Sequence, residues 1–261
     1  MPSGYAHYRF GAQLLPTLPR EVREVIGRHR GLFDVGLQGP DLFFYYNPVR
    51  KNRIAPLAHR CHAQSGRIFF SRVCKGLGSN PSESALAYLC GLLAHYSLDS
   101  LCHPFVYRCT REEAVGHMAL ETEFDRYLLE KDGKLPPHTQ NTGRYIRLSP
   151  EECAVAAGFY PDVTPKEMSR CVRNMAWALR QLAKSNPLFR KVMAFVLGFT
   201  PYRQMLMPEE PDPLCARFDG KLEELYCQAL ALYPKLLEQI MAYFARGEEP
   251  GGEFTPPFDI D

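Results

Sequence analysis

The residues best suited to chemistry are histidines and carboxylates in the first half of the chain. Seven of the eight histidines lie within the first 117 residues, and the densest segment is His95-x3-Asp99-x3-His103. On a helix these three positions fall within an arc of roughly 80°, so their side chains point the same way. Burying two imidazoles and a carboxylate without partners costs several kcal/mol or more. A bound metal ion would remove that cost.

A second pair, His117-x3-Glu121, has the same helical spacing. Imidazole and carboxylate in this arrangement can share one ion at roughly 2.0–2.2 Å, the usual zinc distance. A single pair of this kind is more often a surface ion pair. Two pairs on neighbouring helices, with His103 between them, favour a metal site.

Three further places could supply ligands. Asp41 follows a Gly-Pro turn and precedes an aromatic run, residues 42–46, although a turn aspartate that caps the next helix has the same appearance. His59 and His62 lie one helical turn apart, and His7 stands alone near the N-terminus. A solitary histidine is usually exposed or hydrogen-bonded rather than a ligand.

The elements that must position these residues are predicted to be helices. Apolar residues recur every three or four positions in residues 16–30, which predicts an amphipathic helix that ends near Gly31. Asn80, Pro81 and Glu83 suit a helix start and precede an almost wholly apolar helix through Cys102. Such a helix belongs in the centre of a bundle.

A third helix is predicted from Thr110, with Glu113 at the capping-box position, to a stop at Asp132-Gly133. Residues 133–148 are polar and predict a loop. Further helices are predicted near residues 150–158, 164–185, 188–198 and 214–246, and neither a strand series nor a repeat is apparent.

These elements predict an all-α fold, a multi-helix bundle. We expect a single domain over residues 1–261, with the motifs in 5–130, helical completion in 131–248, and an irregular, mobile tail at 249–261.

Composition sets limits on partners and location. The net charge of +2 arises from 31 basic and 29 acidic residues, so we expect no stable nucleic-acid partner. Peripheral contact with a membrane is compatible with this charge. The N-terminus has no signal-peptide pattern, and no stretch approaches the roughly 18 apolar residues of a membrane span. The chain is therefore expected to be cytoplasmic. Its nine cysteines form no CxxC pair, and most of them are expected to be buried core residues.

Four segments together resemble one family. GPDLFFYY, HRCH, HYSLDSLCHPF and HMALE, in this order within roughly residues 5–130, resemble the zinc-dependent phospholipase C family, in particular its bacterial cytosolic branch. That family is distantly related in fold to the fungal zinc nucleases. The resemblance implies an all-α bundle with a cluster of two or three Zn²⁺ ions.

The resemblance also assigns ligands to individual ions. Asp41, either His59 or His62, His95 and Asp99 would hold the first zinc, and His62 is preferred because SGRIFF follows it. Asp99 would bridge to a second ion completed by His7 and the chain's N-terminal group. His103, His117 and Glu121 would form a third site.

The N-terminus departs from the secreted relatives, which expose a new terminal residue by cleavage. Removal of Met1 would leave Pro2 to close the bridged site, and without it the protein would hold two ions. Asp41, which would orient a water, and the bridging Asp99 are the expected catalytic residues.

The implied reaction is hydrolysis of a phosphoester, in which close metal ions activate a water and clamp phosphoryl oxygens. The substrate would be a phospholipid or a soluble phosphodiester. The alternatives are a metal-stabilised helical binding protein without turnover, and a nuclease or phosphatase that uses the same cluster. Structural zinc sites favour cysteine, which argues against the first alternative.

Residues near these motifs in the sequence each have a functional and a structural interpretation. Tyr45, Tyr46 and Phe105 could line the site, although such aromatic residues are more often core. Arg50, Lys51 and Arg53 could serve a nuclease, or form a solvated loop. The run 205–207 could border an apolar entrance, but core packing is the better interpretation.

Overall fold

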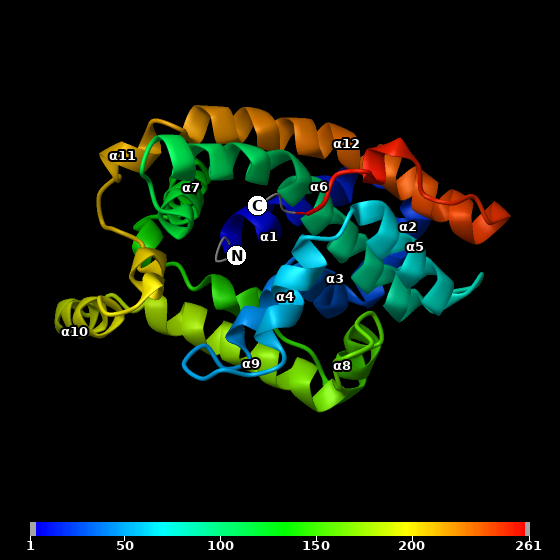
Figure 1. The fold of residues 1–261 in the computed structure, drawn as a ribbon, viewed down its shortest axis with the longest axis horizontal. Coiled ribbons are helices and arrows are strands. Elements are labelled where there is room, and N and C mark those ends of the chain that lie inside the picture. Colours follow the sequence, from blue (N-terminus) through cyan, green and yellow to red (C-terminus); the bar gives the residue numbers. More distant parts are fainter. Residues whose placement is uncertain (1–3, 259–261) are drawn as a thin grey trace.

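The computed structural model describes residues 4–258, and in this range it contains no strand, only one isolated bridge between Ser65 and Pro257. The prediction of an all-α fold is confirmed. Figure 1 shows the arrangement of the helices. They are α1 (Gly4–Leu14), α2 (Arg20–Arg28), α3 (Arg30–Gly36), α4 (Ala55–His62), α5 (Gly66–Leu77), α6 (Glu83–Glu112), α7 (His117–Lys131), α8 (Pro150–Ala157), α9 (Pro165–Leu182), α10 (Pro187–Leu197), α11 (Pro213–Ala216) and α12 (Asp219–Arg246). Short 3₁₀ segments join them, including η2 (Gly39–Tyr45) and η5 (Pro201–Met205).

Helix α6 is the core of the fold and packs against α3 and α12. Its N-cap is Ser82, whose hydroxyl accepts a hydrogen bond from the amide of Ala85 at 3.2 Å, and not the predicted Asn80. The crossing of α6 and α3 requires glycine, because a Cβ on Gly91 would lie 2.2 Å from the carbonyl oxygen of Phe33. This close crossing fixes α6 against the segment that leads into η2.

By length and composition alone, α6 could cross a membrane, contrary to the expectation that no segment is apolar enough. However, 89% of its apolar window is buried inside the fold. The core helix of a soluble protein passes the same test, so this feature is weak evidence for a span.

The boundary between α6 and α7 differs from the prediction. Helix α6 continues through Pro104 to Glu112, and α7 begins at His117 after Gly116 as N-cap. The predicted cap, Thr110, lies inside α6, where its hydroxyl donates to the carbonyl of Val106 at 3.0 Å. A threonine that bonds back to residue i−4 cannot cap the following helix. The predicted stop is confirmed by Gly133, which has φ +68°.

The predicted helix over residues 16–30 is also divided. Residues Leu15–Thr17 form a 3₁₀ turn, and α2 and α3 are separated at His29, whose φ and ψ are −124° and 39°. The sequence analysis did not predict α1, α3, α4 or α5 as helices. The later helices match α8, α9, α10 and the pair α11 and α12, and residues 133–148 contain only 3₁₀ turns.

The C-terminal segment is irregular, as predicted, but it is not free of the fold. The rings of Phe254 and Phe258 are fully buried. The carbonyl of Pro256 accepts a hydrogen bond from the amide of Gly66 at 2.9 Å. The segment thereby closes the core over α5 and α6.

All nine cysteines are free thiols, and seven of them are buried, which agrees with the prediction that most are core residues. Burial raises the pKa of Cys74 and Cys90 to about 12, so these two thiols stay protonated and behave as small apolar residues.

Candidate metal centre

Three groups of histidines and carboxylates converge in the middle of the fold. In each group the ligand atoms lie within 4.8 Å of one another. The groups are His7 with His95 and Asp99, Asp41 with His62 and His95, and His103 with His117 and Glu121. The structure therefore brings together eight of the nine predicted metal residues, from α1, η2, α4, α6 and α7.

The backbone fixes how three of the imidazoles are presented. The Nδ1 atoms of His62, His95 and His103 lie 2.7, 3.2 and 3.0 Å from the carbonyl oxygens of Ala58, Leu37 and Phe258. Because a carbonyl can only accept, each Nδ1 carries the proton and each Nε2 holds a lone pair. A ligand histidine that donates its other nitrogen to a carbonyl is the usual arrangement in metal sites.

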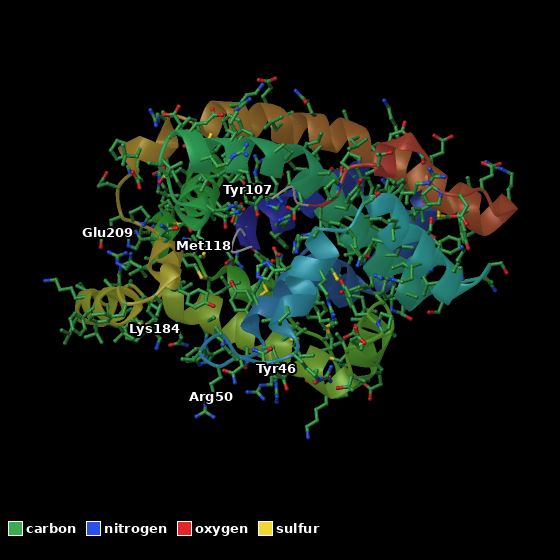
Figure 2. All side chains as sticks on the ribbon, viewed as in Figure 1. Tyr46, Arg50, Tyr107, Met118, Lys184 and Glu209 are labelled. Carbon is green, nitrogen blue, oxygen red and sulfur yellow. The ribbon has the colours of Figure 1, made fainter. Side chains whose placement is uncertain are left out.

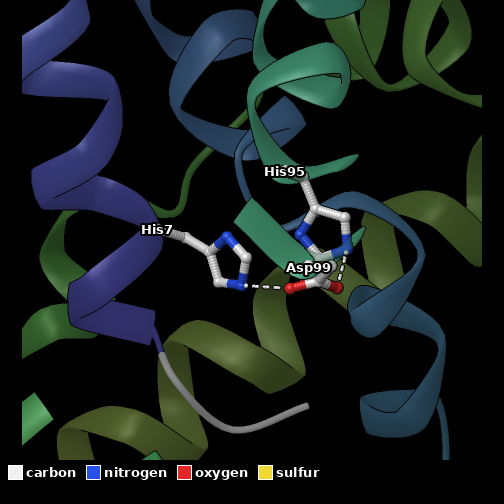
Figure 3. A group of neighbouring side chains, drawn as sticks. All are labelled: His7, His95 and Asp99. Atoms are coloured by element: carbon white, nitrogen blue, oxygen red, sulfur yellow. Dashed lines mark ion pairs between the residues drawn. The ribbon is translucent and has the colours of Figure 1, made fainter. Parts of the chain in front are cut away.

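Asp99 lies between His7 and His95 of the first group (Figure 3) and also approaches His62 of the second. Its Oδ1 lies 3.3 Å from Nε2 of His7, and its Oδ2 lies 3.0 Å from Nε2 of His95 and 3.7 Å from Nε2 of His62. Burial alone would raise the pKa of Asp99, but the imidazoles of His103, His95 and His7 hold it well below its usual range. The carboxylate is thus ionised in the centre of the cluster.

Asp41 faces the same centre from η2. Its Oδ1 lies 3.1 Å from Nε2 of His62. Gly39 allows this approach, because it has φ +49° and a Cβ there would lie 2.4 Å from the ring of His95. Burial opposes ionisation of Asp41, yet nearby positive charge, including His62 and His95, lowers its pKa below the usual value.

His59 is the one predicted ligand outside these groups. It is exposed, and its ring packs edge-on against Phe44 at a centroid distance of 4.9 Å. His62, one turn later, is only 4% exposed. Of the two alternatives, His62 is the residue that faces the cluster.

The third group joins the ends of α6 and α7. Glu121 Oε1 lies 3.1 Å from His117 Nε2 and 3.5 Å from His103 Nε2. Burial raises the pKa of Glu121, but these two imidazoles outweigh it and lower the pKa to about 2. The His117 side chain is 19% exposed, whereas the other seven clustered residues are buried. Access from solvent is therefore best at His117, beside the ring of Tyr107 at 4.9 Å.

Two supporting residues were missed by the sequence analysis. Asp125 on α7 accepts hydrogen bonds from the amides of Tyr5 and Ala6 at 3.0 and 2.7 Å. It caps the start of α1 and so places His7. Phe258, through its carbonyl, sets the tautomer of His103. Nothing in the sequence around Asp125 shows that it caps a helix 119 residues away. The carbonyl of Phe258 belongs to the backbone and has no sequence signal.

The donor set can be tested for its fit to a metal ion. Side-chain atoms that are buried without a hydrogen-bond partner in the described part of the chain include Nε2 of His62 and His95, Oδ2 of Asp99 and Oε2 of Glu121. Nε2 of His95 and Oδ2 of Asp99 are 3.0 Å apart, and in the neutral tautomer that the Leu37 carbonyl sets for His95 both atoms carry lone pairs. Facing lone pairs repel unless a cation lies between them. Nitrogen and carboxylate oxygen donors of this kind fit zinc.

The aromatic and basic residues that the sequence analysis considered near the site differ in their burial. Tyr45 is buried, and Tyr46 and Phe105 are partly buried against the core. Arg50, Lys51 and Arg53 are all exposed, and Arg53 forms an ion pair with Glu167 at 2.6 Å and donates a hydrogen bond to the carbonyl of Asp162 at 2.7 Å.

Within the run 205–207, Leu206 is core. Met205 and Met207 line a small cavity beside α7 together with Asp125 and His138. The predicted ligand Pro2 lies outside the described residues.

Comparison with known proteins supports the interpretation of the geometry. A family model described as zinc dependent phospholipase C matches residues 6–186, which extends beyond the motifs recognised in 5–130. No curated protein and no solved structure matches the chain. The match spans all three groups and most of the chain, and the chain therefore belongs to the zinc-dependent phospholipase C family.

Proposed function

We propose that this protein is a zinc-dependent hydrolase of phosphodiesters. The reaction would take place at the cluster formed by the three groups of histidines and carboxylates. The observation that carries the proposal is the convergence of imidazole lone pairs and ionised carboxylates in three adjoining groups. Buried members of this set, among them Nε2 of His62 and His95 and Oδ2 of Asp99, have no hydrogen-bond partner among the described residues, and a metal ion would satisfy them.

The ligands are assigned to the ions by group. Asp41, His62, His95 and Asp99 would hold one ion, His7 and Asp99 would contribute to a second, and His103, His117 and Glu121 would hold a third. When bound, zinc ions supply Lewis-acid stabilisation of phosphoryl oxygens and make water more acidic. Whether two or three ions bind depends on the chain's N-terminal group, which we propose as the remaining ligand beside His7.

The protein's own groups supply orientation and proton transfer. Asp41 is a buried, ionised carboxylate of the cluster, and it would accept a hydrogen bond from the attacking water and orient the lone pair of that water toward phosphorus. Backbone carbonyls hold the rings of His62, His95 and His103, so the cluster is rigid before substrate arrives.

Tyr45 is a candidate donor to the substrate. Its hydroxyl is buried and has no hydrogen-bond partner among the described residues. Burial, followed by the negative charges of Asp41, Asp125 and Glu121, raises the pKa of this phenol, so it keeps its proton. A protonated hydroxyl beside the cluster suits a phosphoryl oxygen.

Substrate would approach on the His117 side, since the other clustered residues are buried (Figure 2 labels the adjacent Tyr107 and Met118). The same burial favours the second candidate function, a metal-stabilised helical protein without turnover. A nuclease is less well supported, because Arg53, although exposed, is held by the carboxylate of Glu167 and the carbonyl of Asp162.

The test is hydrolysis by zinc-loaded protein of bis-p-nitrophenyl phosphate, p-nitrophenyl phosphorylcholine, p-nitrophenyl phosphate and single-stranded DNA. We expect turnover of the two diesters above that of the monoester, abolished in Asp41→Asn with zinc retained in the third group. Zinc-loaded protein that turns over none of the four would favour the non-catalytic function.

The proposed location is the cytoplasm. Nine free thiols, most of them buried, suit a reducing compartment. Cell fractionation of the tag-free protein tests this, and recovery in an extracellular fraction would contradict it.

A further inference from the structure

Helix α10 is unusual in this fold because it contains no buried residue. Leu188, Val192, Phe195 and Val196 are 72, 51, 70 and 55% exposed, and Phe199 just beyond the helix is 79% exposed. The helix begins at residue 187, directly after the segment matched by the family model. The helix therefore lies outside the family match.

The exposed apolar residues form a single face. At about 100° per residue, Phe195, Leu188, Val192 and Val196 occupy an arc of roughly 100° on the helix. A helix of a globular protein normally turns such a stripe toward the core. Here α10 stands at one end of the molecule, away from α6 and α12 (Figure 1). A contiguous exposed apolar face of this kind marks an interaction site.

The opposite side of α10 is fastened to the protein. Arg190, whose side chain is 11% exposed, donates a hydrogen bond to the carbonyl of Met207 at 2.6 Å and lies 3.8 Å from Glu209. The apolar face is thus held outward by contacts on the other side of the same helix.

The surrounding sequence has one sign of charge. Residues 168–208 contain no Asp or Glu and seven basic residues, namely Arg170, Arg173, Arg180, Lys184, Arg190, Lys191 and Arg203. Lys184, Lys191 and Arg203 are exposed, and the Lys184 ammonium lies 4.5 Å from the ring centroid of Phe189 on α10. Cations therefore flank the apolar face.

We infer that α10 is a docking helix for a phospholipid bilayer that contains anionic lipid. An apolar face flanked by lysine and arginine places side chains among the acyl chains and cations beside the headgroup phosphates. A second copy of this chain fits the face less well, since a two-fold contact would bring the exposed cations Lys184 and Lys191 of one copy beside those of the other.

The docking helix is connected to the mouth of the candidate metal centre. The 3₁₀ segment η5 follows α10, and its residue Gln204 packs directly on Gly116, the neighbour of His117 in the chain. The contact is so close that a Cβ added to Gly116 would lie 2.1 Å from the side chain of Gln204. Tyr202 donates a hydrogen bond to the carbonyl of Pro48 at 3.5 Å. A bilayer bound at α10 would therefore lie near the accessible His117 side of the cluster.

The loop that contains Pro48 extends the same surface. Val49 is 89% exposed, and the exposed cations Arg50 and Lys51 follow it; Figure 2 shows Arg50 pointing outward from this loop and Lys184 from the α10 side. The inference goes beyond the proposed hydrolysis and rests on different residues, so either can fail alone.

The experiment measures co-sedimentation of the full-length, zinc-loaded protein with vesicles, at several salt concentrations. The vesicles contain phosphatidylcholine alone or phosphatidylcholine mixed with phosphatidylglycerol. Two variants remove the docking features, Phe195→Ser combined with Phe199→Ser, and Lys191→Gln. The matched controls are Ile68→Ser, at a residue that is 63% exposed on α5, and Lys166→Gln, at the other end of α9. Each protein is also assayed on bis-p-nitrophenyl phosphate and by light scattering.

We expect binding to the mixed vesicles that weakens with salt. The double serine variant should lose roughly tenfold or more in affinity and Lys191→Gln about fivefold. The controls should bind as the wild type does, and no variant should change hydrolysis of the soluble diester.

Absence of binding, or binding that the α10 variants do not weaken, would overturn the inference. So would a wild-type dimer that the serine variant converts to a monomer, because a second copy would then cover the face. Vesicle binding by protein that hydrolyses no diester would refute the proposed function and leave the docking helix standing.

Discussion

Replacement of Asp125 should loosen α1 and weaken zinc binding near His7, although Asp125 is not a predicted ligand. Its carboxylate, 6% exposed, accepts the amides of Tyr5 and Ala6 at 3.0 and 2.7 Å. Each charge-assisted hydrogen bond contributes about 1.5–3 kcal/mol, and a buried amide left without an acceptor adds a cost. An asparagine keeps one acceptor oxygen and loses the charge. We expect Asp125→Asn to lower the free energy of unfolding by about 2 kcal/mol and Asp125→Ala by about 3–5 kcal/mol.

The assay is urea unfolding of chelator-treated protein, with zinc per chain measured on separate samples of the same variants purified without chelator. Asp132→Asn is the matched control, because Asp132 also joins α7 to α1, through Arg9 at 2.9 Å and the Tyr5 hydroxyl at 2.6 Å, but is 26% exposed and keeps an acceptor oxygen for Tyr5 as asparagine. An ion pair of that exposure contributes about 1 kcal/mol or less, and its loss should not alter zinc content. If Asp125→Asn destabilises no more than Asp132→Asn and retains all zinc, the positioning role of Asp125 is refuted.

Three further predictions concern single residues. His62→Ala should remove about one zinc per chain while His59→Ala removes none, as measured by plasma mass spectrometry; equal losses would contradict the assignment of His62. Tyr45→Phe should lower kcat for a soluble diester by about tenfold with zinc content unchanged, and an unaltered kcat would exclude the hydroxyl as a donor. Burial, and after it the negative charge of Glu123, raises the pKa of Asp219 to about 7. Between about pH 4 and about pH 7 the folded state therefore keeps a proton on Asp219 that the unfolded state releases. The free energy of unfolding contributed by this group falls as the pH rises through that range. Asp219→Asn should therefore exceed wild type in urea stability at pH 8 and match it below pH 4, and the reverse order would contradict the shifted pKa.

The parts predicted from sequence are those with a local signal. His95, Asp99 and His103 share one helix face by spacing alone, and the geometry agrees because α6 runs unbroken through all three. The loop over residues 133–148 and the end of α7 before Gly133 were also predicted correctly, because glycine, proline and polar residues mark them in the local sequence. The assignment of these residues as ligands stays a prediction until a metal is measured.

The parts that failed depend on contacts between distant segments. Thr110 and Glu113 have the capping-box spacing, but packing extends α6 through them and turns the threonine hydroxyl inward to Val106. The tail was expected to be mobile because its composition is irregular, yet Phe254 and Phe258 enter the core between α5 and α6. Nothing in the local sequence of α10 shows that its apolar face would be left outside, because the same pattern is typical of a core helix.

The central claim, that the converging residues hold metal, is tested most directly by zinc content per chain. Tag-free protein purified without chelator is compared with Asp99→Asn, which keeps the shape of the residue and removes the charge shared by His7, His62 and His95. Two or three zinc equivalents that fall by at least one in the variant are the predicted result. No stoichiometric metal, or a content that Asp99→Asn leaves unchanged, would contradict the account.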